Sequence, residues 1–386
     1  MAPSVPPKPV EGGLVRSALI SALIAVGLFF LLEGGCRTAV RVRTGTWPVT
    51  RAVAYRELVE RLGTIFQAHP SLVVSGRPGS ELRVLGHQVR FNALGLRGDE
   101  IAIPKPPGRY RVVCEGGSTT FDFLAPDDAS TWPARLQKRL PDADVVNAGF
   151  PGWTTLESLV SLEIREIDLQ PDLVIVFAGI NDLQPASHVP FMPDYSLGHS
   201  DLLPRIRGVA PVPIRLASRS VFVESLLDRI RPGRKDVEGY APAFEWKGGA
   251  RQAEIPQAAV DVFERNLRST IGVAASRGAR TLLVAQTLRF RKGHEAADRD
   301  WVESWTPGLT AEGNVKGLAR YNDVTRKLAA EGLAAFVDPF AGDAFTDADF
   351  ADACHFSPSG SEKLAAALST WIQAARPAGR GAASAP

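Results

Sequence analysis

The chain has 386 residues, of which 45% are hydrophobic and 22% are charged, a balance typical of a globular protein with a sizeable core. The formal net charge of +2, without any basic run interleaved with aromatic residues, argues against nucleic acid as a partner. The three cysteines, Cys36, Cys114 and Cys354, lack the spacing of a zinc site or a disulfide framework.

The amino-terminal region begins with a Pro-rich tail, residues 1–13, which is expected to be disordered. In the apolar segment that follows, sixteen uncharged residues separate Arg16 from Glu33. As a helix these residues would extend about 24 Å at ~1.5 Å per residue, somewhat less than the ~30 Å hydrocarbon core of a bilayer. The apolar pair before Arg16 can make up the difference, so we predict a single membrane helix or signal anchor over residues 14–33.

Two alternatives for this segment are a cleaved signal peptide and a buried core helix. A signal peptide requires small residues before its cleavage site. Glu33 stands where ordinary cleavage, or lipoprotein processing at Cys36, needs a small or aliphatic residue. A core helix usually has a polar face, which this segment lacks, so an uncleaved anchor is favoured. Basic residues are more numerous after the segment than before it, which by the positive-inside rule favours a cytoplasmic carboxyl side.

Residues 34–107 are predicted to form a membrane-proximal lead-in to the rest of the chain. Helical spacing over 51–70 is followed, over 81–98, by an alternation typical of two strands around a turn. A short rigid linker at 103–108, rich in Pro, precedes a change of pattern.

From residue 108 to 378, apolar segments alternate with amphipathic helical segments, an order typical of a parallel sheet covered by helices on both faces. An insert at 184–250, rich in Pro and Arg, is too long for a simple connection and is predicted to form a lid or pocket wall. Residues 379–386 are expected to be a disordered tail. The predicted strands are 110–116, 143–149, 172–179, 280–287 and 334–340, and the predicted helices are 131–140, 155–169, 257–278, 314–332 and a last one after residue 355.

Four short motifs carry polar or small residues at the ends of predicted strands or next to the last helix. Ser118 follows the first strand, Gly149 comes at the end of the second, and Asn181 follows the third. Asp352 and His355 stand just before the last helix. Because the carboxyl ends of parallel strands meet at one edge of a sheet, we expect these five residues to lie close together.

These residue types match the requirements of acyl transfer. A serine hydroxyl needs a base near neutral pH, and an imidazole with a pKa of about 6.5 suits that role. A carboxylate orients the imidazole and stabilises its charged form, and Asp352 can reach His355 within one turn. The tetrahedral intermediate requires placed donors, for which we predict the N–H groups of Ser118 and Gly149 and the side-chain amide of Asn181.

Each of these residues also has a structural interpretation. Ser118 could cap a helix, Asn181 could stabilise a loop, and Asp182 is expected to cap the next turn. Asp352 and His355 could bind a metal, but no third or fourth ligand has suitable spacing. The segment "GGSTT" could hold phosphate, but the lysine of a Walker loop is missing. The remaining histidines lie outside the strand-end motifs, namely His69, His87, His188, His199 and His294. Three aromatic residues could line a pocket, although core packing is favoured for each: Phe121, Trp153 and Phe191.

The segments "GGST", "NAG", "GIND" and "DACH" resemble, in order, the four signature blocks of the SGNH or GDSL-type hydrolases. The resemblance covers residues 110–375. It implies that Ser118 is the nucleophile, His355 the general base and Asp352 its partner, with Gly149 and Asn181 completing the oxyanion hole. It also implies a flavodoxin-like three-layer α/β/α sandwich and a reaction without metal or cofactor.

Two further features bear on this resemblance. The first block departs from Gly-Asp-Ser-Leu at Gly117 and Thr119, which bears on the subfamily more than on the chemistry. The upstream "FNALGLRG" resembles the lead-in of membrane-anchored bacterial members, which implies a catalytic domain outside the cytoplasm, opposite to the orientation that the basic residues favour.

The predicted function is therefore that of a membrane-anchored serine esterase acting through an acyl-enzyme on a small-molecule, carbohydrate or lipid ester. One alternative is an O-acyltransferase that uses the same residues to acylate cell-envelope carbohydrate. Another is a non-catalytic binding module of the cell envelope that keeps only the fold. The acyl chain, the alcohol and the oligomeric state stay open.

Overall fold

The computed structural model describes residues 11–45, 47–48, 50, 60–84, 87–196, 219–230, 249–289, 296–342 and 344–376. It divides into two compact units. The first consists of Met1–Glu57 with Val212–Ala241, and the second of Leu58–Pro211 with Pro242–Pro386.

The first unit contains a long helix, α1 (Glu11–Thr44), and a short one, α8 (Val221–Ile230), which packs against it. α1 starts inside the tail expected to be disordered, of which only residues 11–13 are described, and it continues well past Glu33. Among the described residues, one helical span, Arg16–Thr44, is long and apolar enough to cross a membrane. The apolar segment is therefore helical as expected, and its helix extends further in both directions.

The second unit is built on a five-stranded parallel sheet with the strand order β6-β5-β7-β8-β9. This is the flavodoxin-like order, in which the first strand of the sheet lies inside it and the second forms an edge. All five strands predicted from the apolar segments are present. Their bounds are β5 (Tyr110–Gly116), β6 (Ala143–Asn147), β7 (Leu173–Phe177), β8 (Arg280–Val284) and β9 (Ala335–Val337).

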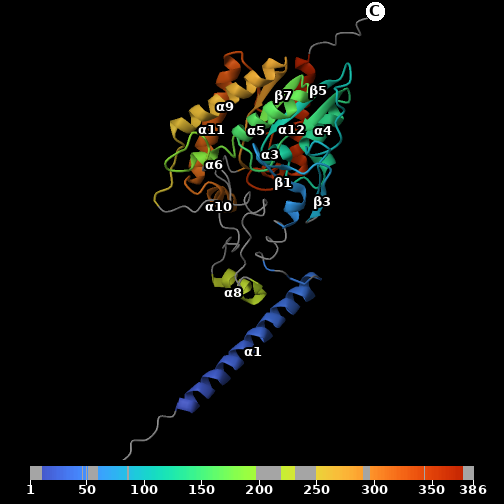
Figure 1. Ribbon diagram of the computed structural model, residues 1–386. Helices are drawn as coiled ribbons and strands as arrows, with labels where there is room; N and C mark the ends of the chain where they lie inside the picture. Colours follow the sequence, from blue (N-terminus) through green and yellow to red (C-terminus); the bar gives the residue numbers. More distant parts are fainter. Residues whose placement is uncertain are drawn as a thin grey trace, which may run out of the picture. The chain divides into compact units, whose positions relative to one another are not determined.

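Helices cover the sheet on both faces and make a three-layer α/β/α sandwich (Figure 1). Successive side chains of a strand point to opposite faces, so in β7 Val174 and Val176 pack into one core and Leu173 and Ile175 into the other. The first core is closed by α5 (Thr155–Ile164), α9 (Gln257–Ser276) and α11 (Ala311–Ala330), and the second by α4 (Trp132–Arg139) and α12 (Pro358–Ala375). The expected fold class is confirmed.

Short elements complete this unit. Among the described residues they include α3 (Ser118–Phe121), α6 (Leu183–Ala186), α10 (Ala296–Trp305) and the 3₁₀ turns Asp128–Ser130, Glu166–Leu169 and Asp347–Asp349. The segment predicted as one helix over 155–169 is thus α5 followed by a 3₁₀ turn.

The lead-in folds onto the sandwich from residue 60 onward and belongs to the same compact unit. The strand pair expected over 81–98 is confirmed as the antiparallel hairpin of β3 (Glu81–Val84) and β4 (His87–Arg90). The helix expected over 51–70 is described only from residue 60 and ends at residue 65. The next residues form β1 (Phe66–His69) instead, because they pair with β2 (Val73–Gly76) and bury Phe66 in an aromatic cluster.

The insert is divided between the two units. Residues 184–196 extend from α6 and bury Gln184 and Tyr195 against the sandwich. Residues 219–230 belong to the first unit, where α8 packs on α1. The insert was predicted to form a lid or pocket wall, and the packing of α8 on α1 was not predicted. The remaining parts, 197–218 and 231–248, lie outside the described residues, as do 1–10 and 377–386.

Candidate active site

Ser118 is the first residue of α3, two residues after β5 ends, and it is half-buried. The turn between strand and helix depends on Gly117, because a Cβ at this position would lie 2.3 Å from the side-chain nitrogen of Asn181. The glycine therefore lets the amide of Asn181 approach the main chain that carries Ser118.

His355 and Asp352 meet Ser118 in one chain of hydrogen bonds, although Ser118 and His355 are 237 positions apart. The imidazole Nε2 lies 2.8 Å from Ser118 Oγ, and Nδ1 lies 2.7 Å from Asp352 Oδ2. The other oxygen of Asp352 accepts hydrogen bonds from the backbone N–H groups of Cys354 and His355, at 2.9 and 2.7 Å. Three of the five residues that were expected to lie close together are thus joined by direct hydrogen bonds.

The contacts of Asp352 favour its ionised form. Burial acts to raise its pKa, but the hydrogen bond from the His355 ring and the two backbone N–H donors outweigh burial and leave the pKa lowered. A carboxylate at this position suits an imidazole that becomes positively charged.

Two aromatic rings flank the imidazole. Phe123 and Trp301, both half-buried, have ring centroids 6.4 and 6.2 Å from that of His355. The aromatic residues named from the sequence have other surroundings. Phe121 and Trp153 belong to the buried aromatic cluster of the lead-in, and Phe191 packs against the core on the α9 side.

Asn181 follows β7 and is buried, and its Nδ2 donates to the carbonyl of Trp153 at 2.8 Å. One N–H of this amide is therefore used by the protein. Because an amide nitrogen carries two hydrogens, one donor is left beside Gly117.

Asp182 does not cap the next turn as expected, since its side chain makes no capping bond to α6. It accepts hydrogen bonds from Thr155 and Tyr195 instead. Burial raises the pKa of Asp182 to about 6 against the lowering effect of these donors. Its contacts join the start of α5 to the loop that carries Asn181.

Gly149 was predicted as an oxyanion donor, and its surroundings bear on that prediction. Its N–H already donates to Asn147 Oδ1 at 3.2 Å. A Cβ at Gly149 would lie 2.4 Å from the backbone nitrogen of Phe121, so the position serves close packing against α3. Gly152 was missed in the sequence, although the Pro-Gly pair before Trp153 signals a turn. It has a φ of +83°, and its N–H, like that of Ser118, has no acceptor among the described residues.

A shallow depression of about 10 Å³ lies beside Ser118. It is lined by the backbone and side chains of the strand-end loops, namely Gly117, Ser118, Thr119, Trp153, Ala178, Gly179, Ile180, Asn181 and Gln286. The free amide hydrogen of Asn181 and the hydroxyl of Ser118 thus share one small space.

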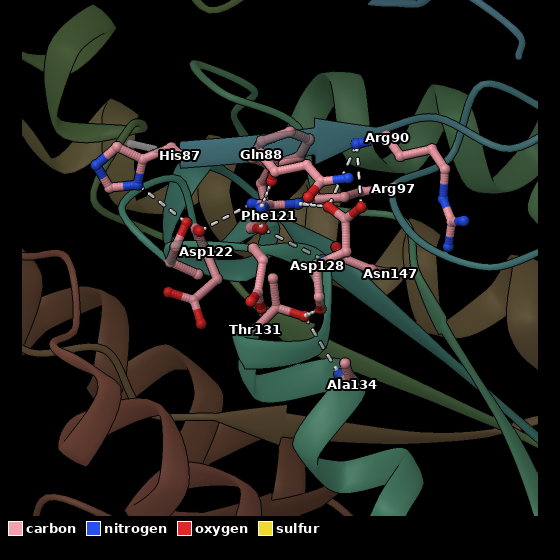
Figure 2. Close-up of polar contacts among 12 residues, drawn as sticks. His87, Gln88, Arg90, Arg97, Phe121, Asp122, Asp128, Thr131, Ala134 and Asn147 are labelled. Carbon is pink, nitrogen blue, oxygen red and sulfur yellow. Dashed lines mark hydrogen bonds and ion pairs between the residues drawn. The ribbon is translucent and has the colours of Figure 1, made fainter. Parts of the chain in front are cut away.

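Arg97, from the lead-in, supports the segment that carries Ser118 (Figure 2). Its buried guanidinium donates to the carbonyls of Phe121 and Asp122, each at 2.9 Å, and pairs with Asp128 at 2.8 Å. It also lies over the ring of Phe121, 4.6 Å from the centroid. Arg97 lies in the motif "FNALGLRG", but its role was not predicted because its partners are far away in the sequence.

Asp122 joins the same segment to two helices. Its carboxyl accepts from the backbone N–H of Trp132 at 2.8 Å and from the hydroxyl of Ser361 at 2.7 Å. Burial raises the pKa of Asp122 to about 6, in spite of these donors and the nearby Arg97. The end of α3 is therefore tied to α4, to α12 and to the lead-in.

Asp352, Cys354 and His355 form the group of possible metal ligands found among the described residues. Asp352 and His355 are already hydrogen-bonded to one another, and His355 is also bonded to Ser118. Burial raises the pKa of the Cys354 thiol well above its usual value, which opposes the thiolate that a metal requires. Hydrogen bonding and burial thus favour the acyl-transfer arrangement over a metal centre.

The other histidines are placed elsewhere. His87 contacts the carbonyl of Ala125, and His69 accepts from Ser71 and Leu72 in its own turn. His188 is half-buried after α6. His199 and His294 lie outside the described residues.

Comparison with known proteins gives a family match and a set of similar structures. The model of the GDSL-like lipase/acylhydrolase family matches residues 114–363. No curated protein matches the sequence.

Several solved structures are similar to this chain. TesA is 19% identical, with a TM-score of 0.39, over 68% of this chain and 98% of that chain. A catalytic mutant of Axe2, an acetylxylan esterase from Geobacillus stearothermophilus, is 19% identical, with a TM-score of 0.40, over 69% and 95%. Est24, a carbohydrate acetylesterase from Sinorhizobium meliloti, is 15% identical, with a TM-score of 0.41, over 69% and 99%.

Proposed function

Since the chain belongs to the GDSL-like lipase/acylhydrolase family, we propose that it is a serine esterase that cleaves carboxylic esters through an acyl-enzyme. The observation that carries the proposal is the hydrogen-bond chain from Ser118 through His355 to Asp352. Each group has the partner that its step requires. Two segments that are distant in the sequence thus bring these three residues together near the carboxyl end of β5.

In the first half of the reaction, Ser118 Oγ attacks the ester carbonyl while His355 Nε2 accepts the hydroxyl proton. The C–O bond of the tetrahedral intermediate then breaks, and the same nitrogen gives its proton to the leaving alcohol. In the second half, water attacks the acyl-enzyme, His355 accepts the proton of the water, and the acid leaves as Ser118 recovers its proton. Asp352 holds the imidazole through Nδ1 and stabilises its charge.

The oxyanion of each intermediate needs donors beside Ser118. The N–H of Ser118 and the second amide hydrogen of Asn181 fit this role, because both are available and Asn181 lies against Gly117. Gly149 was expected as the third donor, and in that role its N–H would have to leave Asn147. The unpartnered N–H of Gly152 is the better candidate for the third position.

We propose a short acyl group as substrate, because the depression that the described residues form beside Ser118 has room for only a small group. A panel of chromogenic esters of graded acyl length tests this. We expect kcat/KM to be highest for the acetyl ester and to fall as the chain lengthens. A maximum at a long chain would contradict the preference for a short acyl group while leaving the esterase proposal intact.

A fluorophosphonate probe tests the nucleophile, because it forms a covalent bond only with an activated serine. We expect one label per chain, located at Ser118, and its loss in Ser118→Ala. Absence of labelling in a folded, full-length protein would favour the non-catalytic binding module. The esterase assay should be run with and without added sugar, because sugar-dependent acyl transfer faster than hydrolysis would favour the O-acyltransferase.

We place the anchor in α1 and the catalytic domain outside the cytoplasm. The apolar span Arg16–Thr44 and the bacterial lead-in motif support this arrangement. The proposed catalytic domain runs over 108–378, with the lead-in from residue 60 folded onto it. Protease added to intact and permeabilised cells measures the orientation. We expect the protease to cleave the domain when only the outer permeability barrier of the cell is opened. Protection of the domain until the cytoplasmic membrane is also opened would indicate the opposite orientation.

A further inference from the structure

Helix α8 of the insert has one apolar side and one polar side. At 100° per residue, Phe222, Val223, Leu226, Leu227 and Ile230 fall on one arc of the helix. The polar residues of the helix fall on the opposite arc, among them Glu224, Ser225 and Arg229. An amphipathic helix is stable when its apolar arc packs against another apolar surface.

The contact with α1 covers only part of the apolar arc. The ring of Phe222 packs edge-on against Phe29 of α1, with centroids 6.4 Å apart. Further along α8, Leu226 and Ile230 are 43% and 65% exposed. The apolar arc therefore continues beyond α1, and its exposed part is formed by Leu226 and Ile230 near the end of α8.

Glu33 of α1 binds the first turn of α8. Its carboxylate accepts hydrogen bonds from the backbone N–H groups of Val221 and Phe222, at 3.0 and 2.8 Å, and from the hydroxyl of Ser220 at 2.7 Å. It also pairs with Arg37 one turn further along α1, at 2.6 Å. A carboxylate that fills the N-terminus of a helix holds that helix in position and direction.

The position of Glu33 sets the depth at which α8 lies. It is the first charged residue after the apolar run, and charged side chains avoid the membrane interior. Phe29 lies four residues earlier, about 6 Å along the helix axis at ~1.5 Å per residue. The contact between Phe29 and Phe222 therefore puts the first turn of α8 at the level where the apolar run ends.

The residues that follow Glu33 on α1 match a membrane surface. Arg37 donates to the carbonyls of Pro48 and Arg219 at 3.1 and 3.0 Å, so it joins α1 to the residue just before α8 as well as to the segment after α1. Arg41 lies over the exposed ring of Trp47, 4.5 Å from its centroid. Tryptophan and arginine are typical of the headgroup region.

We propose that α8 is an interfacial helix that lies in the surface of the lipid bilayer, with Leu226 and Ile230 inserted at the boundary between headgroups and acyl chains. Glu33 is the positioning residue that fixes α8 to the end of the membrane span. We assign the lipid surface as the partner of the exposed apolar arc because of where α8 is held. Among the described residues, α1 has the one span long and apolar enough to cross a membrane, and α8 is bound to α1 at the point where the apolar run of α1 ends. The proposal does not depend on the esterase activity.

Site-directed spin labelling of the full chain in vesicles of phosphatidylcholine and phosphatidylglycerol tests the proposal. In a Cys36→Ser background, where the remaining thiols are buried, labels are attached at Leu226→Cys and, as matched control one residue away, at Ser225→Cys. We expect the label at 226 to be accessible to oxygen and protected from a water-soluble nickel chelate, and the label at 225 to show the reverse. Equal exposure of both labels to the nickel chelate would overturn the proposal.

A second copy of the chain is the competing occupant. In that case the label at 226 would be protected from oxygen and nickel alike, and spin–spin broadening would disappear on dilution with unlabelled chain. That result would also overturn the proposal.

The role of Glu33 is tested with Glu33→Ala and the control Glu224→Gln, which removes a carboxylate from α8 itself. We expect faster amide hydrogen exchange at 221–223 and a more mobile label at 226 in Glu33→Ala, with turnover of a soluble ester unchanged. Unchanged exchange and mobility in Glu33→Ala would contradict the positioning role.

Discussion

Two groups of carboxyl side chains near strand β5 have opposite properties: Asp352 at the rim of the sheet, and Glu115 with Glu166 in the interior. At the carboxyl end of β5, Asp352 is bonded through both oxygens, its pKa is lowered, and its side chain is 27% exposed. Three residues before Ser118, Glu115 is fully buried, and neither of its oxygens has a hydrogen-bond partner. Burial, and next the charge of Glu166, raise the pKa of Glu115 well above its usual value.

The difference shows where in this fold a carboxyl group is ionised and where it is neutral. A carboxylate is kept ionised where backbone N–H groups and an imidazole can bind it, at the rim of the sheet. Behind the rim, Glu166 takes up the available donors through one oxygen, from Ser161 at 3.0 Å and from Arg165 at 2.7 Å. Glu115 is left without a donor and is expected to be neutral. Substitutions at the rim should therefore change turnover, whereas substitution of Glu115 should change stability.

The largest effect is expected for Ser118→Ala. Removing the nucleophile should lower kcat on a short-chain ester by about 10⁶-fold, while the melting temperature stays close to that of the wild type because Ser118 is only half-buried. Steady-state kinetics and a thermal melt measure both. Turnover near the wild-type rate would identify a different nucleophile.

Asp352→Asn should lower kcat by about 10⁴-fold, because an amide cannot stabilise the imidazolium and favours the wrong tautomer of His355. The exposed Asp142, which pairs with Arg376 on the surface, provides the control Asp142→Asn. That variant should retain activity. A loss of equal size in both variants would mean that general charge, and not the bond to His355, matters at position 352.

Asn181→Ala should lower kcat by about 10²–10³-fold with a smaller change in KM, because a donor to the oxyanion is lost. The variant Asn181→Asp keeps the shape of the side chain and removes the donor hydrogens, so it should be at least as slow. If KM alone rises, Asn181 binds the ground state of the substrate.

The smallest effect, and the one that separates the two groups, is expected for Glu115→Gln. Because the folded-state pKa of Glu115 lies above its unfolded value, the wild type loses stability as pH rises from the ordinary carboxyl range through the raised pKa. The amide removes that loss, so the variant should be more stable than the wild type at alkaline pH, by about 1–3 kcal/mol. Near pH 4 the two should unfold alike, and kcat at neutral pH should not change.

Chemical denaturation at several pH values measures the difference between Glu115→Gln and the wild type. The exposed Glu163 on α5 provides the control Glu163→Gln, which should show no such dependence on pH. A fall in kcat of the size expected for Asn181→Ala would show that Glu115 acts on the rim and would break the separation between the two groups.

The sequence predicted what depends on local pattern. All five strands of the sheet follow from their apolar runs. The meeting of Ser118 with Asp352 and His355 follows from the place of Ser118 after a strand and of the other two just before the last helix. Patterns of this kind need no knowledge of distant partners.

What the sequence did not predict depends on such partners. Arg97 acts through the carbonyls of Phe121 and Asp122, which no spacing reveals. The N–H of Gly149 is engaged by a side chain two residues away, whereas Gly152 has a positive φ and open space at its Cβ position. The contact of α8 with Glu33 joins residues 187 to 189 positions apart, and helical periodicity in α8 gives the apolar arc without naming what it covers.

The distance along the chain between Ser118 and His355 has a consequence for biogenesis. A growing polypeptide presents its serine early, yet that hydroxyl has no base until the segment before α12 has been synthesised and docked. In the proposed mechanism, a shortened product that ends before His355 would lack the general base, however well its first strands assemble. On the same proposal, ester turnover would require that the segment before α12 has been synthesised and has docked.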